Sequence, residues 1–357
     1  MLILLIILIA FLILLYERFF SYTCLDGFQA ELLLDQPRSS RYDKFDVILT
    51  LKNSGWIIIP VIRVHLIYSD SLQCNDQDRI RTSLLFHQMS RRRISFSGKV
   101  RGIHPIRAEI EVNDFFGLTK KSLTLEPVSI IIHPEIKEMD LPDAVSGTEG
   151  DFLVQRWIFP DPIFFTGNRP YTGYEALKEI DWKASARMGT LRVKQHDTTA
   201  SFNAVFCLLC ENNENLYAEN SRYLEEAILL CASLIHQAAS SQSPVGLITN
   251  AVIKTEFGSV FRPDNGLNHI IRCYDTLSCM APYKQKDSTY LFRQIYDFMT
   301  TGSHCVIIAN QINDEIYNGL IALGQKGIQS ILFLYEWDNQ ISAPFGTTVL
   351  PFLKEKA

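Results

Sequence analysis

The densest group of side chains able to form ion pairs and cation–π contacts lies near the middle of the chain. Four cationic residues alternate there with two acidic and two aromatic ones: Arg169, Lys178, Lys183 and Arg187 with Glu175, Asp181, Tyr171 and Trp182. Such a group either joins two parts of one chain, as a clasp, or faces a protein partner, and both interpretations stay open. A catalytic role for Asp181 or Glu175 is not favoured, because no nucleophile or base lies nearby in the sequence.

Cys207 and Cys210 form the one Cys-x-x-Cys pair of the sequence. They lie in the apolar run 205–210, which predicts a buried strand. Side chains three residues apart on a strand point to opposite faces, so this pair is not expected to share a metal ion. We interpret both cysteines as core residues. Free thiols without a disulfide framework are typical of a reducing compartment.

The charge and the motif content argue against several classes of function. The 357 residues carry a net charge of −5, whereas proteins that bind nucleic acids need clustered Lys and Arg. The basic cluster Arg91-Arg92-Arg93 leads straight into an apolar segment and is interpreted as the solvated start of a strand. The sequence contains no phosphate-binding loop, Gly-x-Ser-x-Gly, His-Glu-x-x-His or protein-kinase motif. No nucleic-acid partner, no catalytic residue and no enzymatic activity are therefore expected.

Residues 1–20 are predicted to attach the chain to a membrane. Residues 1–15 are uninterrupted apolar sequence, and a helix of about 20 residues spans roughly 30 Å. A secretory signal peptide needs a basic start and a small-x-small cleavage site, and both are absent here, so the prediction is an uncleaved anchor. Tyr16, Phe19 and Phe20 are expected at the membrane interface. Arg18 lies on the C-terminal side of the span, which places the domains in the cytoplasm by the positive-inside rule.

Residues 27–135 show short alternating segments with turn signals such as Asn53-Ser54-Gly55 between them. Strands are predicted over 45–51, 56–62, 64–68, 92–96, 106–112, 118–125 and 129–133. No helical period interrupts them, so the expected fold is an antiparallel β-sandwich.

From residue 201 to residue 357, predicted strands alternate with predicted helices. The strands cover 203–210, 245–249, 252–257, 304–309 and 328–335, and the helices cover 221–241, 264–277, 287–300 and 314–323. Ser221 is expected to cap the first helix. The alternation favours a Rossmann-type α/β domain, a mostly parallel sheet with helices on both faces. Residues 136–200, between the two domains, are expected to form an irregular linker or clasp segment.

Two motifs carry a resemblance to a known family. The first is Arg101-Gly102-Ile103-His104-Pro105 with Asn113-Asp114-Phe115-Phe116-Gly117-Leu118, and the second runs from Asn168 to Leu191 and contains Asp181-Trp182-Lys183-Ala184-Ser185-Ala186-Arg187-Met188-Gly189. Together they resemble the bacterial membrane-protein family called domain of unknown function 58 (DUF58). The sequence departs from the family at Tyr174-Glu175, where the family has Gly-Asp, and it begins with one apolar segment where the family usually has two membrane spans.

The resemblance implies that residues 201–357 are similar to von Willebrand factor A domains, which often bind Mg²⁺ through Asp-x-Ser-x-Ser after the first strand and through later Thr and Asp residues. The matching positions here are Glu211, Asn213 and Asn215, with Asn310 after a later strand; a frame that starts at Cys210 gives Cys210, Asn212 and Glu214. Amides and a thiol lack the carboxylate charge that attracts a hard cation. The site is therefore predicted to be degenerate, and neither a metal nor another cofactor is expected.

The resemblance also implies a partnership with MoxR-type AAA+ ATPases and a link to cell-envelope assembly or stress. The expected function is that of a membrane-anchored adaptor whose sandwich spaces a partner-binding domain from the bilayer. Two alternatives stay open. One is a metal-dependent enzyme that uses the 211–215 loop, and the other is a passive structural protein of the envelope.

Overall fold

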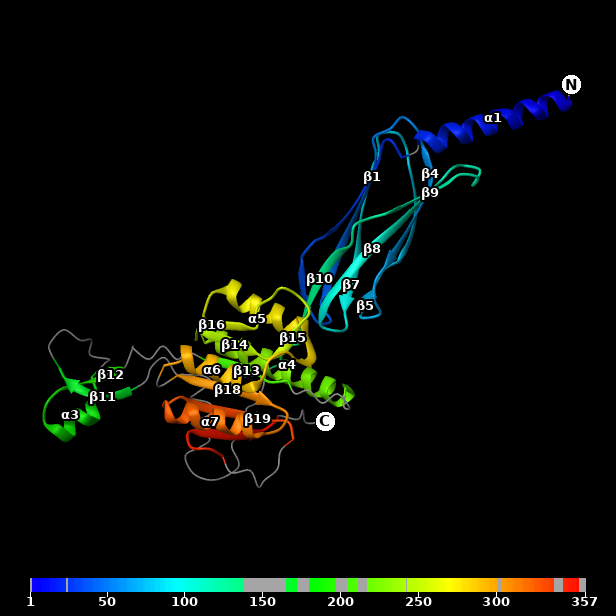
Figure 1. Ribbon diagram of the computed structural model, residues 1–357. Helices are drawn as coiled ribbons and strands as arrows, with labels where there is room; N and C mark the ends of the chain where they lie inside the picture. The colour runs from blue at the N-terminus through cyan, green and yellow to red at the C-terminus, as the bar shows by residue number, and fades with distance from the viewer. Residues whose placement is uncertain are drawn as a thin grey trace. The chain divides into compact units, whose positions relative to one another are not determined.

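The computed structural model describes residues 2–23, 25–137, 165–171, 180–196, 204–210, 217–241, 243–300, 303–336 and 343–352. The chain separates into two compact units, Met1–Glu135 and Ile136–Ala357 (Figure 1).

The first unit begins with helix α1 (Leu2–Thr23). Its stretch Ile3–Thr23 is long and apolar enough to cross a membrane, and a signal sequence near an N-terminus has the same properties. The side chain of Phe20 is fully buried in the core of the domain that follows. Phe20 therefore packs against the strands of the sandwich and does not face lipid, because the helix runs on to Thr23 and its last turns contact this core.

Two sheets follow the helix in the first unit. One has the strand order β1 (Phe28–Leu34), β3 (Lys44–Asn53), β7 (Met89–Gly98), β5 (Leu72–Cys74). The other has the order β2 (Arg38–Ser40), β10 (Val128–His133), β8 (Gly102–Asn113), β4 (Ile59–Ile67), β6 (Arg79–Leu84), with β9 (Lys120–Thr124) paired to β8. Alternate side chains of both sheets point into one shared apolar core.

Among the described residues of this unit, every strand pairing is antiparallel except one. Strand β2 runs parallel to β10, so the prediction of a wholly antiparallel sandwich is wrong at this edge. The physical reason is that the chain continues from β1 into β2 in the same direction while it changes from one sheet to the other.

Part of the segment predicted as an irregular linker has regular structure. Strands β11 (Phe165–Pro170) and β12 (Arg192–His196) pair antiparallel, and helix α3 (Trp182–Met188) lies between them in the sequence. These elements have 6, 5 and 7 residues. Elements this short show no periodicity in the sequence, which explains why they were not predicted.

The second unit contains a six-stranded sheet in the order β16 (Val260–Asp264), β14 (Val245–Thr249), β13 (Ala204–Leu208), β18 (His304–Ala309), β19 (Gln329–Leu334), β20 (Thr347–Pro351). All neighbours are parallel except β14 and β16. The predicted strand 252–257 is wrong, because the chain there divides into β15 (Ala251–Ile253), a turn, and β16. Strand β15 pairs with β17 (Met280–Lys284).

Helices pack on both faces of this sheet (Figure 1). Apolar side chains of α4 (Tyr217–Ser240) and α5 (Leu267–Cys279) share one core, and those of α6 (Ser288–Phe298) and α7 (Asp314–Gln325) share the other. Helix α4 begins four residues before the predicted cap at Ser221, so Ser221 lies inside the helix. Cys210 belongs to the first core and Cys207 to the second, which confirms that the two thiols point to opposite faces.

Candidate functional site

The carboxyl edge of the parallel sheet is the first candidate site. Strand β14, the next parallel strand in the sequence, lies on one side of β13, and β18 lies on its other side. The strand order therefore reverses between β13 and β18. In open α/β sheets, ligands bind outside the carboxyl ends of the strands at such a point. Cys210, Asn250 and Asn310 follow the ends of β13, β14 and β18 and therefore surround it.

Tyr223 of α4 occupies the point where the strand order reverses. Its hydroxyl lies 2.8 Å from the carbonyl oxygen of Leu209 and 3.3 Å from that of Ile308, so it bridges the ends of β13 and β18 and donates its proton to the nearer oxygen. Its buried ring packs edge-on against Tyr335 and Phe352. The protein's own aromatic side chains thus fill this position, which suits a rigid support better than a pocket for a small molecule.

Tyr335 in this aromatic cluster also has a polar partner. Its hydroxyl lies 3.4 Å from Oε1 of Glu226. Burial raises the pKa of Tyr335, and the negative charge of Glu226 raises it further. Tyr335 therefore stays protonated near neutral pH and serves as a hydrogen-bond donor rather than as a base.

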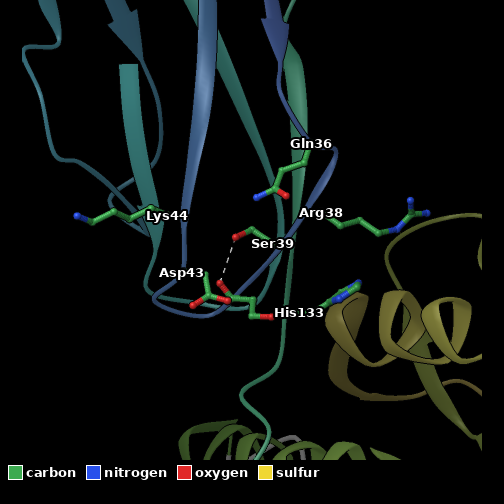
Figure 2. Close-up of a pocket in the computed structure, with 7 residues that line it drawn as sticks. Gln36, Arg38, Ser39, Asp43, Lys44 and His133 are labelled. Atoms are coloured by element: carbon green, nitrogen blue, oxygen red, sulfur yellow. Dashed lines mark hydrogen bonds between the residues drawn. The ribbon is translucent and has the colours of Figure 1, made fainter. Parts of the chain in front are cut away.

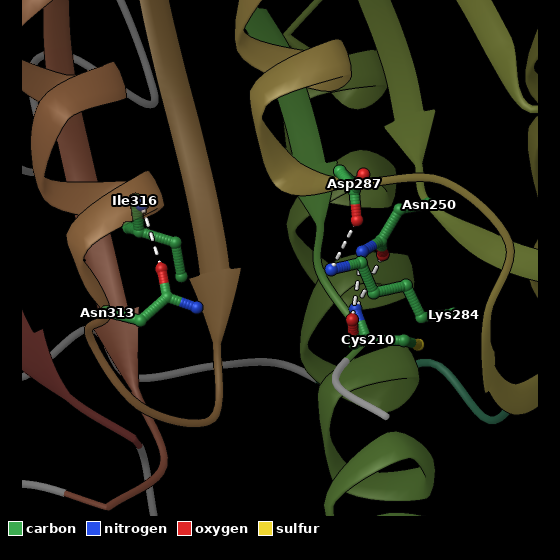
Figure 3. Close-up of polar contacts among 6 residues, drawn as sticks. All are labelled: Cys210, Asn250, Lys284, Asp287, Asn313 and Ile316. Carbon is green, nitrogen blue, oxygen red and sulfur yellow. Dashed lines mark hydrogen bonds and ion pairs between the residues drawn. The ribbon is translucent and has the colours of Figure 1, made fainter. Parts of the chain in front are cut away.

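Asn250 holds the start of the loop that follows β13 (Figure 3). Its amide nitrogen donates to the carbonyl of Cys210 at 2.8 Å, and its amide oxygen accepts from the backbone N–H of Cys210 at 2.7 Å. The side chain is almost fully buried. Asn250 was not predicted from the sequence, although a polar residue directly after a buried strand is a usable signal.

Two further polar contacts near this edge stabilise the ends of a loop and a helix. Lys284 and Asp287 form an ion pair at 2.8 Å (Figure 3), and because Asp287 is exposed the pair contributes less than about 1 kcal/mol. Asn313 caps α7, with its side-chain oxygen accepting from the backbone N–H of Ile316 at 2.9 Å. These contacts fix the ends of helices and loops and set up no acid–base pair.

The predicted metal positions Glu211, Asn213 and Asn215 lie outside the described residues. Asn310 lies at the end of β18, as the sequence indicated, and its carbonyl oxygen accepts from the backbone N–H of Glu336 at 2.9 Å. Within the described residues, no group of three or more His, Cys, Asp or Glu is placed to hold a metal ion.

Millimolar Mg²⁺ is expected to leave the melting temperature of the full chain almost unchanged, because stabilisation follows RT ln(1 + [L]/Kd) and amides bind this cation weakly. Differential scanning fluorimetry with and without Mg²⁺ measures the shift. A rise of several degrees would restore the metal-dependent alternative if Glu211→Ala or Glu214→Ala abolished it. Glu256→Ala, on an exposed loop, is the control and should keep the rise in that case.

The second candidate site is the segment around α3, where three residues of the family-like motif have structural roles. The carboxylate of Asp181 caps the helix by accepting from the backbone N–H of Ala184 at 3.0 Å. The hydroxyl of buried Ser185 donates to the carbonyl of Asp181 at 2.7 Å and accepts from the N–H of Arg192 at 2.8 Å. Gly189 ends the helix with φ at 66°, a left-handed conformation that favours glycine.

Other residues of the same motif face outward. Trp182 exposes 62% of its surface, and Lys183 and Arg187 are exposed one helical turn apart. Within the described residues neither cation forms an ion pair. Met188 and Leu191 are exposed beside them in the sequence, so we call Trp182, Lys183, Arg187, Met188 and Leu191 the α3 face.

The other predicted residues of this segment are only partly described. Tyr171 is half-buried, and its backbone N–H donates to the carbonyl of Leu191 at 2.9 Å. The backbone of Arg169 pairs with that of Val193 in the β11–β12 ladder. Glu175 and Lys178 lie outside the described residues.

A third candidate is a polar cavity of about 430 Å³ in the first unit (Figure 2). Its lining is entirely polar: Gln36, Arg38, Ser39, Ser40, Asp43, Lys44 and His133. A ligand pocket is usually lined mostly by apolar side chains with a few convergent polar groups. This cavity lacks the apolar walls and is a weak candidate for a ligand site.

Comparisons with known proteins give one family and several distant structures. Residues 167–331, just under half of the chain, match the family model "Protein of unknown function DUF58". No curated protein matches the chain. Among solved structures, native alpha-2-macroglobulin from Escherichia coli is similar at 17% identity over 30% of this chain and 17% of that one, with a TM-score of 0.27. The CARDB domain of PF1109 from Pyrococcus furiosus is similar at 14% identity over 30% of this chain and 94% of that one, with a TM-score of 0.23.

Proposed function

We propose that the protein is a membrane-anchored adaptor that binds a protein partner and catalyses no reaction itself. The observation that carries the proposal is the α3 face. Buried or capping groups of Asp181, Ser185 and Gly189 fix the short helix, while an exposed tryptophan and two exposed cations point away from it. Tryptophan and arginine are the residue types most enriched at binding hot spots.

The partner that fits the α3 face is a protein with an apolar groove and acidic groups at its rim. The groove would take Trp182 and Met188, and the carboxylates would pair with Lys183 and Arg187. The family resemblance directs this expectation to a MoxR-type AAA+ ATPase. The clasp interpretation is less favoured, because a clasp requires Trp182 to be buried and most of its surface is exposed.

The second unit of this adaptor is proposed to be a von Willebrand factor A-like domain that acts as a rigid support. The parallel order β14-β13-β18-β19-β20 and the helices on both faces support this proposal. The filling of the edge by Tyr223 and its aromatic neighbours supports a binding role over a catalytic one. A cell-envelope process follows from the family resemblance alone.

The proposed anchor is α1, with both units in the cytoplasm. The apolar length of the helix supports the anchor. Arg18, at the C-terminal end of the span, supports the orientation through the positive-inside rule. All cysteines in the described residues are free thiols, as is usual in a reducing compartment.

Trp182→Ala is expected to weaken binding of the full chain to a MoxR-type AAA+ ATPase of the same organism by about 30-fold or more, because loss of an aromatic hot spot costs about 2 kcal/mol or more. The free energy of unfolding should change by less than about 1 kcal/mol, since the side chain is exposed. Calorimetric titration in detergent measures the affinity, and urea unfolding measures the stability.

Trp56→Ala is the matched control, because Trp56 is also an exposed tryptophan but belongs to the first unit. It should bind the ATPase as the unchanged protein does. If Trp182→Ala loses stability but keeps its affinity for the ATPase, the clasp is favoured. If the unchanged protein, Trp182→Ala and Trp56→Ala all bind the ATPase equally well, the α3 face is not the binding surface.

A further inference from the structure

The strand register of the first unit gathers three loops at the end of the sandwich that α1 enters. Strand β1 begins within five residues of the end of α1, and three register pairs mark this end: Phe28 with Asn53, Ile59 with Leu84, and Val61 with Asn113. The loops after β3, β6 and β8, residues 54–58, 85–88 and 114–119, therefore lie at the same end as the last turn of the helix (Figure 1).

These loops carry large apolar side chains that each expose more than half of their surface. They are Trp56, Leu85, Phe86, Phe115, Phe116 and Leu118, which we call the apolar rim. Single exposed apolar residues are normal on a soluble surface. Six of them on neighbouring loops at one end of a domain indicate a binding surface.

Two buried polar residues hold the loops in place. The amide nitrogen of Asn53 donates to the carbonyls of Ile57 at 2.7 Å and Leu85 at 2.9 Å, which ties the first two loops together. The carboxylate of Asp114 accepts from the backbone N–H of Thr119 at 3.0 Å and that of Phe116 at 3.2 Å. Hydrogen bonds thus fix the backbone of these loops, while their large apolar side chains face solvent.

A ring contact joins the apolar rim to the proposed membrane span. The rings of Phe116 and Tyr16 meet edge-on, with centroids 6.1 Å apart. Tyr16 lies one helical turn before Phe20 in the sequence. It is therefore about 6 Å farther from the sandwich than Phe20, measured along the helix axis. If α1 crosses the bilayer, a side chain that contacts Tyr16 lies at the depth of Tyr16, which is the interfacial region.

Exposed arginines follow the apolar rim at a short distance. Arg91, Arg92 and Arg93 of β7 are all exposed, and none of them forms an ion pair within the described residues. With a rise of about 3.3 Å per residue, the three arginines lie about 7–13 Å from Met89 at the start of the strand, the depth at which lipid headgroups would lie.

We propose that this end of the sandwich rests on an anionic lipid bilayer. The apolar rim enters the interfacial region beside α1, and Arg91, Arg92 and Arg93 bind headgroup phosphates. The proposal rests on the membrane anchor of the proposed function. The apolar rim is continuous with the proposed membrane span, which favours lipid as the occupant. The opposite end of the sandwich carries the polar cavity of Figure 2 and has no comparable group of exposed apolar side chains among its described residues. The contact gives the first unit a second attachment that fixes its tilt against the bilayer.

Tryptophan quenching by lipid tests the proposal on the full chain. Trp157, Trp182 and Trp337 are changed to phenylalanine, which leaves Trp56 as the single reporter. The protein is reconstituted into vesicles of phosphatidylglycerol and phosphatidylethanolamine that contain brominated acyl chains. The control reporter is Tyr42→Trp in a Trp56→Phe background, because Tyr42 is exposed at the far end of the sandwich.

The expected result is loss of Trp56 emission in brominated vesicles and unchanged emission of the Tyr42→Trp reporter. Arg91→Gln, Arg92→Gln and Arg93→Gln together should reduce the loss, as should replacement of phosphatidylglycerol by phosphatidylcholine. If the protein floats with the vesicles but Trp56 emission is not quenched, this inference is overturned and the anchor stands. The apolar rim would then be assigned to a protein partner. Equal quenching of both reporters overturns the end-on contact. Protein that does not float overturns the anchor itself.

Discussion

Asn250→Ala is expected to lower the free energy of unfolding of the second unit by about 2–6 kcal/mol. The Asn250 amide makes a hydrogen bond to the backbone N–H and another to the carbonyl of Cys210. Alanine leaves both buried backbone groups without this partner, and each such group costs about 1–3 kcal/mol. Urea unfolding of the full chain in detergent, followed by far-UV circular dichroism, measures the loss.

Gln311→Ala is the matched control for this prediction. Its amide is also near the carboxyl edge and contacts Glu336, but it is exposed. Its removal should cost less than about 0.5 kcal/mol. Asn250→Asp should also be destabilised, because it keeps the acceptor for the Cys210 N–H, loses the donor to the carbonyl and buries a charge. If Asn250→Ala and Gln311→Ala unfold at the same urea concentration, Asn250 does not hold the start of the loop that follows β13.

The central strands of the second unit could be predicted from the sequence because long apolar runs leave one interpretation. The predictions for β14 and β18 agree with the structure at both ends, and β19 differs by one residue at each end. The prediction failed where elements are short. The run 252–257 looked like one strand because it is rich in β-branched and aromatic residues, but the structure places only Ala251–Ile253 in a strand.

The candidate sites were harder to predict because a motif does not show which of its residues face solvent. In the segment around α3, Asp181 and Ser185 fix the backbone and Trp182 is exposed. In the β8–β9 turn, Asp114 fixes the backbone and Phe116 is exposed. Both motifs thus combine residues that hold a turn or helix with residues that this turn or helix presents, and only side-chain hydrogen bonds and burial separate the two groups.

Phe20→Ala is expected to lower the free energy of unfolding of the first unit by about 3–5 kcal/mol, as loss of a fully buried phenylalanine does in other cores. Phe20 has no exposed surface, and its ring lies in the core shared by both sheets. Tyr16 stacks on it with centroids 6.0 Å apart. Melting of the full chain in detergent micelles, followed by near-UV circular dichroism, measures the effect.

Phe19→Ala separates packing in the sandwich from apolar contact with detergent or lipid. Phe19 is the neighbouring residue of the same type in the same helix, but it exposes 57% of its surface, so its removal should cost the sandwich less than about 1 kcal/mol. Both variants keep the apolar run of residues 1–15 and should float with vesicles as the unchanged protein does. If the two substitutions destabilise the sandwich equally, the last turns of α1 are not docked on it, and the contact of Phe116 with Tyr16 can no longer fix the depth of the apolar rim. If only Phe20→Ala is destabilised, the helix and the sandwich share one core, and an anchored α1 holds the apolar rim at the bilayer surface.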